Sequence, residues 1–311
     1  TAVCIAREEL SRVCAHADLL FAETGLCAFP IRTFGSDEQK EKYLNAFSKG
    51  ELIGSYALTE PDAGSDVGSM QTTAKLDGDD YVLNGTKCFA SVGPDAQTYV
   101  TYAKTDPDAG AKGISAFIVE KGTPGFSGKP MKLMAPHPIG ELTFNDCRIP
   151  KDNIIGEPGQ GMRIAMTTLD FMRTSVGAHA LGTAQRAYEE ALNYAKNRKA
   201  FGQPIANFQN TQFKLADMAT ELDAARLLVY RAAWMRDEVS DRVTKEASMA
   251  KLYATEMAGR VVDQALQIHG GYGVLRGSVI EKLYREVRQP RVYEGTSEIQ
   301  RMVIGRHILG S

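Results

Sequence analysis

Apolar residues recur at helical spacing through the first fifty residues of the chain. From Val3 to Ala17 they stand three or four positions apart, which is the spacing of one buried face of an α-helix. Gly25 and Pro30 are expected to break this helix. A second, short helix is expected to begin near Ser36, because a serine followed three positions later by a glutamine has the pattern of a capping box.

The pattern changes between residues 52 and 152, where short runs rich in β-forming residues follow one another. Asp-Gly, Asn-Gly and Pro-Gly pairs separate these runs, as turns between antiparallel strands require. No helical segment here is long enough for a βαβ unit, so a Rossmann-type sheet is not expected. The predicted strands cover 53–58, 71–76, 81–83, 98–103, 114–120 and 141–144.

Helical periodicity returns after residue 152 and continues to the end of the chain. Three long segments, at 162–198, 208–236 and 244–268, carry apolar residues at helical spacing, which predicts a helical bundle. Glycine and alanine are frequent in the first of them, so this helix is expected to approach its neighbours closely. The whole pattern predicts an α+β protein with three domains: residues 1–52, helical; 53–152, an antiparallel β domain; and 153–311, a helical bundle.

Composition excludes several classes of function. The chain has 36 basic and 38 acidic residues, so it lacks the basic excess of a nucleic-acid-binding protein. No apolar stretch approaches the roughly 20 residues that cross a bilayer, and no targeting segment is recognised at the beginning of the sequence. The five cysteines are odd in number and scattered, which predicts free thiols in a reducing compartment.

Common catalytic motifs are absent from the sequence. It contains no GxxxxGK[ST], HExxH or GxSxG pattern. The five histidines lie far apart in the sequence, so no metal site is expected.

Two segments do carry chemical information. In ALTEPDAGSD, residues 57–66, the hydroxyl groups of Thr59 and Ser65 stand beside free backbone amides, which suits an anion or a polar heterocycle, although a plain turn has the same pattern. The second segment joins QIHGGYG, residues 267–273, to VYEGTSE, residues 292–298. Its Glu294 is either a desolvated carboxylate that serves as a base or a cap for a helix starting near Ser297, and the residues themselves leave both interpretations open.

Together with two further motifs, these segments resemble the acyl-CoA dehydrogenase family over essentially the whole chain. ALTEPDAGSDVGS is similar to the family's first signature and QIHGGYGV to its second, except that Gly277 replaces the usual acidic or amide residue. NRKAFGQ, residues 197–203, resembles the flavin-contacting helix end, and YEGT, residues 293–296, the catalytic loop. The resemblance implies the fold of that family, with N-terminal helices that begin partway into the usual domain, a central antiparallel β domain and a C-terminal four-helix bundle.

The resemblance also implies FAD as the cofactor, bound between the β domain and the bundle and partly by a neighbouring subunit. Phe89 and Ser91 are expected at the isoalloxazine ring, where relatives often have tryptophan and threonine, and Arg198 is expected to pair with the pyrophosphate. The residues implied at the FAD site are Tyr56, Leu58, Thr59, Ser65, Phe89, Ser91, Arg198, Phe201, Gln209, Gln267, Gly270, Gly271, Thr296 and Glu298.

The implied reaction is α,β-dehydrogenation of an acyl-CoA thioester to the trans-2-enoyl-CoA. Glu294 is expected to remove the α-proton while the β-hydrogen leaves as hydride to flavin N5. Some relatives carry the base on an earlier helix, but Met172 occupies that position here and cannot accept a proton. The residues implied at the substrate are Ser65, Arg173, Tyr293 and Gly295.

The implied partners are an electron-transfer flavoprotein and further copies of the chain in a homodimer or homotetramer, in the cytoplasm or, in a eukaryote, the mitochondrial matrix. A flavin-dependent acyl-CoA oxidase of the same fold and a truncated, inactive subunit are the alternatives. The segment MAPHPI, residues 134–139, departs from the loop of many relatives and suggests a branched, cyclic or aromatic acyl group. His137 in that segment is interpreted as structural in preference to substrate-binding.

Overall fold

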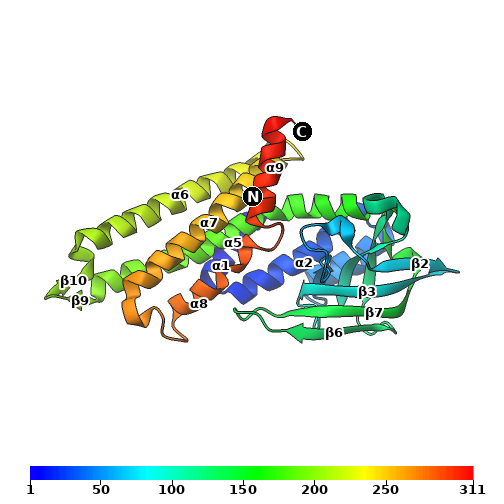
Figure 1. The fold of residues 1–311 in the computed structure, drawn as a ribbon, viewed down its shortest axis with the longest axis horizontal. Helices are drawn as coiled ribbons and strands as arrows, with labels where there is room; N and C mark the ends of the chain where they lie inside the picture. Colours follow the sequence, from blue (N-terminus) through cyan, green and yellow to red (C-terminus); the bar gives the residue numbers. More distant parts are fainter. Residues whose placement is uncertain (311) are drawn as a thin grey trace. The chain divides into compact units, whose positions relative to one another are not determined.

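The computed structural model describes residues 1–310, which form two compact units (Figure 1). One unit comprises Thr1–Asp18 and the chain from Asp170 onward, and the other comprises Leu19–Leu169. These units group the chain differently from the three expected domains, whose bounds stay a prediction: the first helix groups with the C-terminal helices and the rest of the N-terminal segment groups with the sheet.

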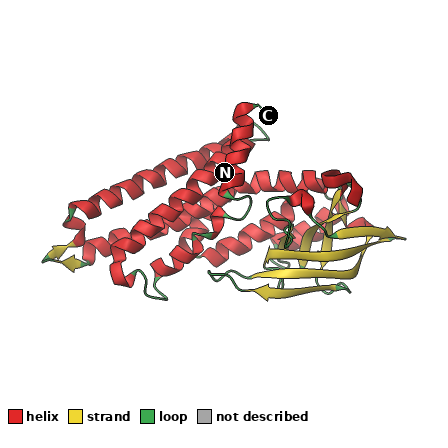
Figure 2. Cartoon of the chain, viewed as in Figure 1, coloured by secondary structure: helices red, strands yellow, loops and turns green. Residues whose placement is uncertain are grey.

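The unit 19–169 is built around a mixed eight-stranded sheet, drawn in yellow in Figure 2. Most pairs are antiparallel, as expected, but β1 runs parallel to β4 and β2 meets β4 in a single parallel bridge. The order is β6-β7-β3-β2-β4-β5-β8, with β1 on β4. The strands are β1 Gly54–Ala57, β2 Thr73–Asp77, β3 Asp80–Ser91, β4 Thr98–Lys104, β5 Ile114–Glu120, β6 Phe126–Met131, β7 Ile139–Pro150 and β8 Ile154–Ile155.

The helical part of this unit differs from expectation at one point. Helix α2, Ala15–Phe34, continues through Gly25 and Pro30, and the break falls earlier, at the extended residue Cys14. A proline inside a helix removes one backbone hydrogen bond, but the side chains of Cys27 and Ile31 on either side of it are fully buried in the core of the unit. Burial of this face therefore outweighs the local cost.

Beyond α2, the predicted capping box is present. Ser36 accepts a hydrogen bond from the backbone of Gln39, whose side chain accepts one from the backbone of Ser36. The segments that follow are α3 Asp37–Gln39, a π-helical turn Lys40–Leu44 and α4 Asn45–Ser48.

The other unit is a helical bundle whose core is rich in alanine. Gly182 of α5 lies against the backbone of Glu8 in α1, where a Cβ atom would overlap the Glu8 carbonyl oxygen, so the predicted close approach is observed. The helices are α1 Ala2–Val13, α5 Gly161–Asn197 from residue 170 on, α6 Gln209–Glu238, α7 Thr244–His269, α8 Val279–Glu286 and α9 Ser297–Leu309, with a small hairpin of β9 Lys199–Ala200 and β10 Gln203–Pro204.

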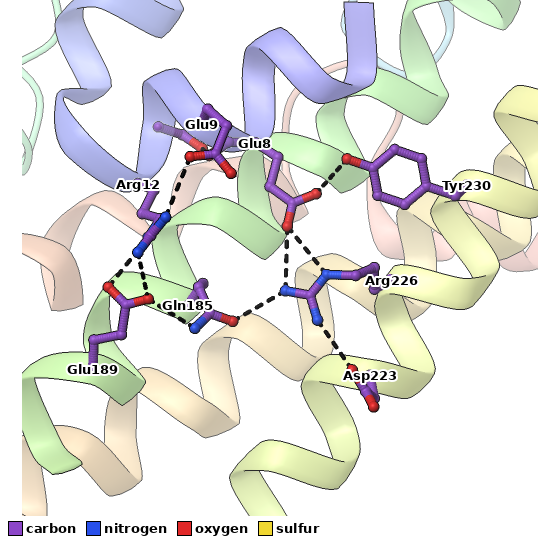
Figure 3. A network of polar contacts seen from close by, with 9 residues as sticks. Glu8, Glu9, Arg12, Gln185, Glu189, Asp223, Arg226 and Tyr230 are labelled. Atoms are coloured by element: carbon purple, nitrogen blue, oxygen red, sulfur yellow. Dashed lines mark hydrogen bonds and ion pairs between the residues drawn. The ribbon is translucent and has the colours of Figure 1, made fainter. Parts of the chain in front are cut away.

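A polar network attaches α1 to this bundle (Figure 3). The carboxylate of Glu8 accepts hydrogen bonds from Arg226 and, at 2.6 Å, from the Tyr230 hydroxyl group, both on α6. Arg12 pairs with Glu189 on α5 at 2.8 Å. These contacts explain why the first helix belongs with the C-terminal helices. No helix within residues 1–310 is long and apolar enough to cross a membrane.

Candidate active site

The first signature forms a turn that leaves strand β1. Leu58 is buried, Thr59 is partly buried, and Ser65 is exposed on the turn. The turn is attached to β3, because the Cys88 N–H donates to the Thr59 carbonyl at 2.8 Å. The structure therefore brings this turn beside the end of β3, where Phe89 and Ser91 lie.

A buried ion pair, which the sequence did not reveal, supports the same turn. The Lys87 ammonium group donates to Glu60 at 2.7 Å and to the Leu58 carbonyl at 3.2 Å. Glu60 also accepts the Thr72 N–H at 3.0 Å. Burial lowers the pKa of Lys87 to about 8 even though Glu60 favours its charged form. The backbone of the signature is thus held by a fully hydrogen-bonded pair.

Phe89, near the end of β3, has an exposed aromatic ring and a strained backbone conformation. Phe89 has a φ of 56° and is 53% exposed, and a non-glycine residue rarely adopts this region. Ser91 lies two residues further and is 2.9 Å from the Nε2 atom of His137. His137 therefore contacts a residue expected at the flavin ring. Tyr56, on β1, is partly buried and packs edge-on against Tyr102.

A second group of expected site residues lies at one end of the bundle. Arg198, Gly270 and Gly271 line a hollow of about 480 Å³, together with Tyr194 and His269. Tyr194 and His269 stack with ring centroids 4.5 Å apart. A Cβ atom at Gly270 or Gly271 would meet open space, so the backbone of both glycines faces the hollow beside a guanidinium group, although the Gly270 N–H itself donates to the Gln267 carbonyl at the end of α7. This combination of donors suits a pyrophosphate.

Three expected residues are exposed and do not line this hollow. Phe201, in the β9–β10 hairpin, is 95% exposed, and Gln209 and Gln267 are exposed on α6 and α7. The resemblance implies that a neighbouring subunit supplies Arg198, Phe201 and Gln209 to the FAD site, and these roles stay predictions.

The third group lies in the turn before α9. Thr296 caps this helix, because its hydroxyl group accepts the Ile299 N–H at 3.3 Å. Glu298 is exposed in the first helical turn. The cap is thus Thr296, and the interpretation of Glu294 as the capping residue is wrong.

Glu294 has the surroundings expected of a base. Its Oε2 atom is inaccessible to solvent and has no hydrogen-bond partner within residues 1–310. Burial raises the pKa of Glu294, while the positive charges of Arg7, Lys251 and Arg173 oppose that shift. The desolvation inferred from the sequence is therefore present.

Buried charged groups surround this carboxylate within the bundle. Arg7 pairs with Asp18 at 2.9 Å and donates to Ser175, and Arg173 pairs with Asp170 at 2.7 Å. Met172, at the alternative position for a base, is buried beside Arg173. Tyr293 and Gly295, expected at the substrate, flank Glu294 and are partly buried. Sequence reasoning missed Arg7 and Asp18, for which no motif signals a role.

The comparisons with known proteins match the chain almost from end to end. The family models of the acyl-CoA dehydrogenase N-terminal, middle and C-terminal domains match residues 1–51, 55–147 and 159–309. The short-chain specific acyl-CoA dehydrogenase of mouse mitochondria is 47% identical over 99% of this chain and 75% of the relative.

Two solved structures extend this similarity to the fold. Butyryl-CoA dehydrogenase from Megasphaera elsdenii is 42% identical, with a TM-score of 0.96 over 98% of this chain and 81% of that one. PigA, solved with FAD and proline, is 34% identical, with a TM-score of 0.94 over 98% of this chain and 81% of that one.

Proposed function

Because the chain belongs to the acyl-CoA dehydrogenase family, we propose that it oxidises an acyl-CoA thioester to the trans-2-enoyl-CoA with FAD as cofactor. The family, its α+β fold, the oxidoreductase class and the cofactor, all predicted from the sequence, are confirmed by the comparisons. The observation that carries the proposal is Glu294, a carboxylate with a buried oxygen and a raised pKa in the YEGT segment.

Glu294 removes the α-proton of the thioester in this proposal. Its raised pKa makes it a stronger base than an exposed carboxylate, and no hydrogen bond within residues 1–310 occupies its Oε2 atom. The Glu294 N–H stabilises the thioester oxygen as negative charge develops. FAD, when bound, supplies the acceptor for the β-hydride. Arg173, Tyr293, Gly295 and Ser65 are assigned to substrate positioning.

The donors at the two candidate flavin regions fit the cofactor. Arg198, with the unobstructed backbone at Gly270 and Gly271, is assigned to the pyrophosphate and the adenosine half, supported by the hollow that these residues line. The residues assigned to the rest of the FAD site are Tyr56, Leu58, Thr59, Ser65, Phe89, Ser91, Phe201, Gln209, Gln267, Thr296 and Glu298.

We also propose an electron-transfer flavoprotein as the electron acceptor and a homodimer or homotetramer as the assembly. The resemblance supports assembly, since it implies an FAD site partly formed by a neighbouring subunit, and Phe201, which is 95% exposed, is accessible to such a subunit. The mitochondrial relative supports a mitochondrial location in a eukaryotic source. The matrix, and the cytoplasm in a bacterium, are proposed from the resemblance alone.

The acyl group is proposed to be short. The mouse relative is short-chain specific, and the solved relative from Megasphaera acts on butyryl-CoA by its name. These two relatives do not support the branched, cyclic or aromatic group suggested by residues 134–139, but the 3-(aryl)acrylate reductase of Clostridium sporogenes, which is 47% identical over 97% of this chain, supports an aromatic one.

An anaerobic titration of the purified protein tests this function. Butyryl-CoA is expected to bleach the visible absorbance of the flavin, whereas isobutyryl-, cyclohexanoyl- and phenylpropionyl-CoA are expected to act more weakly. Rapid oxygen consumption during turnover would identify an oxidase. A colourless protein, or one whose absorbance no thioester changes, would overturn the proposal in favour of an inactive subunit.

A further inference from the structure

Helix α7 carries a lysine on its buried face. Lys251 is 0% exposed and lies among the buried residues Ala247, Ala250 and Ala254. Its ammonium group donates to the Gly295 carbonyl at 2.6 Å and forms no ion pair within residues 1–310. A buried, unpaired ammonium group is costly, so its position calls for a function.

The backbone that Lys251 holds is strained. Glu294 has a φ of 52° and Gly295 a φ of 88°, so two successive residues occupy the left-handed region. Glycine adopts this conformation readily, but glutamate does not. Strain of this kind persists only where neighbours over-determine the conformation.

Lys251 and Gln300 are those neighbours. The Gln300 amide donates to the Gly295 carbonyl at 2.8 Å and to the Glu294 carbonyl at 3.2 Å. Gln300 thus binds both carbonyl groups of the strained turn, and Lys251 binds that of Gly295. The conformation of this turn sets the direction of the Glu294 side chain.

The charges around Glu294 distinguish Lys251 from the other cations. Arg7 on α1 is paired with Asp18 on α2, and Arg173 on α5 is paired with Asp170. The charge of Arg7 opposes the raised pKa of Glu294 more strongly than that of Lys251, but Asp18 acts in the opposite direction. Among these three cations, Lys251 alone has no carboxylate partner of its own within residues 1–310. Two more distant carboxylates, Glu256 and Glu298, also favour the charged form of Lys251. Glu256 is paired with Arg291, and Glu298 is exposed.

We infer that Lys251 is a positioning residue for the proposed base: its ammonium group fixes the Glu294–Gly295 turn, and its uncompensated charge keeps the Glu294 carboxylate ionised. The inference rests on the proposed function, because it concerns the ionisation of the base. Burial lowers the pKa of Lys251 to about 8, so the group remains mostly charged at neutral pH.

The test is the pH dependence of kcat/KM for butyryl-CoA in Lys251→Gln, Lys251→Arg and Gln300→Leu. The value of kcat/KM reports the pKa of the base in the free enzyme. In the pH profile, kcat/KM falls at low pH as the base becomes protonated, and this part of the profile is the acid limb. Lys251→Gln keeps a donor and loses the charge, so the acid limb is expected to move to higher pH by about one unit. Lys251→Arg keeps the charge and is expected to leave the limb in place. Gln300→Leu is expected to lower kcat without moving the limb.

A second measurement reports the base without turnover. The infrared band of the protonated Glu294 carboxyl group, identified by its loss in Glu294→Gln, is expected to persist to higher pH in Lys251→Gln. An acid limb and a carboxyl band that match the wild type in Lys251→Gln would overturn the inference. If that variant does not fold, a shift of the limb in Lys251→Arg, which keeps the charge, overturns it equally.

Glu294→Gln separates this inference from the proposed function. If Glu294→Gln is inactive and keeps its flavin while Lys251→Gln has the wild-type acid limb, only the inference about Lys251 fails. If Glu294→Gln remains active, the assignment of the base fails, and the inference fails with it.

Discussion

The two units each bury a lysine against a functional turn, and the two lysines differ in how their charge is balanced. In the sheet unit, Lys87 donates to the Leu58 carbonyl and contacts Glu60 at 2.7 Å. In the bundle, Lys251 donates to the Gly295 carbonyl without an ion-pair partner within residues 1–310. Burial lowers the pKa of each lysine to about 8.

Because only Lys87 has an ion-pair partner in the described part of the chain, we expect Lys87 to stabilise the fold and Lys251 to act on the charge of a neighbouring group. The charge of Lys87 is neutralised by Glu60, which also accepts a backbone hydrogen bond, so little of its field reaches other groups. The charge of Lys251 acts on the carboxylate of Glu294 instead. A paired lysine therefore secures the first signature, and an unpaired one adjusts the proposed base.

The largest effect on stability is expected for Lys87→Met. This variant leaves Glu60 as an unpaired buried charge, and breaking such a pair costs about 3–5 kcal/mol of unfolding free energy. Urea unfolding monitored by circular dichroism measures the loss. The double variant Lys87→Met with Glu60→Met is expected to recover most of it, because no buried charge remains. A double variant as unstable as the single one would contradict the ion-pair interpretation.

A smaller loss, less than about 2 kcal/mol, is expected for Lys251→Met. The variant gives up a charge-assisted hydrogen bond but also removes the cost of burying an ammonium group. The same urea experiment provides the comparison. Equal losses in Lys87→Met and Lys251→Met would remove the distinction between the two regions.

The smallest effect is a pH dependence of stability with opposite signs at Glu60 and Glu294. Burial alone would raise the pKa of Glu60, but Lys87 and backbone donors lower it below the value of about 4.5 in the unfolded chain. The ionised Glu60 therefore stabilises the folded protein above pH 4.5, and this stabilisation is lost as pH falls through the pKa of the folded state. Burial raises the pKa of Glu294, so its contribution is most favourable below 4.5 and is lost as pH rises through the folded pKa.

Unfolding free energies of the wild type, Glu60→Gln and Glu294→Gln between pH 3 and 7 measure these signs. As pH rises, the wild type is expected to become more stable relative to Glu60→Gln. Over the same range it is expected to become less stable relative to Glu294→Gln. Slopes of the same sign would show that one of the two carboxylates has different surroundings from those described.

Much of the fold and part of the candidate site can be predicted from local sequence patterns. The long helices follow their apolar period, and the motif around Glu294 identified the base as a candidate. The parallel pairing of β1 with β4 was not predicted, because it joins strands whose partners, such as Gly54 and Thr98, lie far apart in sequence. The continuation of α2 through Pro30 depends on core burial that no local pattern expresses.

The lysines were missed for a related reason. Lys251 lies on an apolar helix face, where a lysine ordinarily extends its ammonium group to solvent. Its acceptor, the Gly295 carbonyl, comes from a turn 44 residues later in the chain. Lys87 and Glu60 are likewise 27 residues apart. Such partnerships become visible only when the packed structure is known.

The most direct test of the account is the rate of anaerobic flavin reduction by butyryl-CoA in Glu294→Gln, followed in a single turnover. The rate is expected to be lower by about 10³-fold or more with unchanged flavin content, because the amide cannot accept the α-proton. Flavin reduction at a rate near that of the wild type would contradict the assignment of Glu294 as the base.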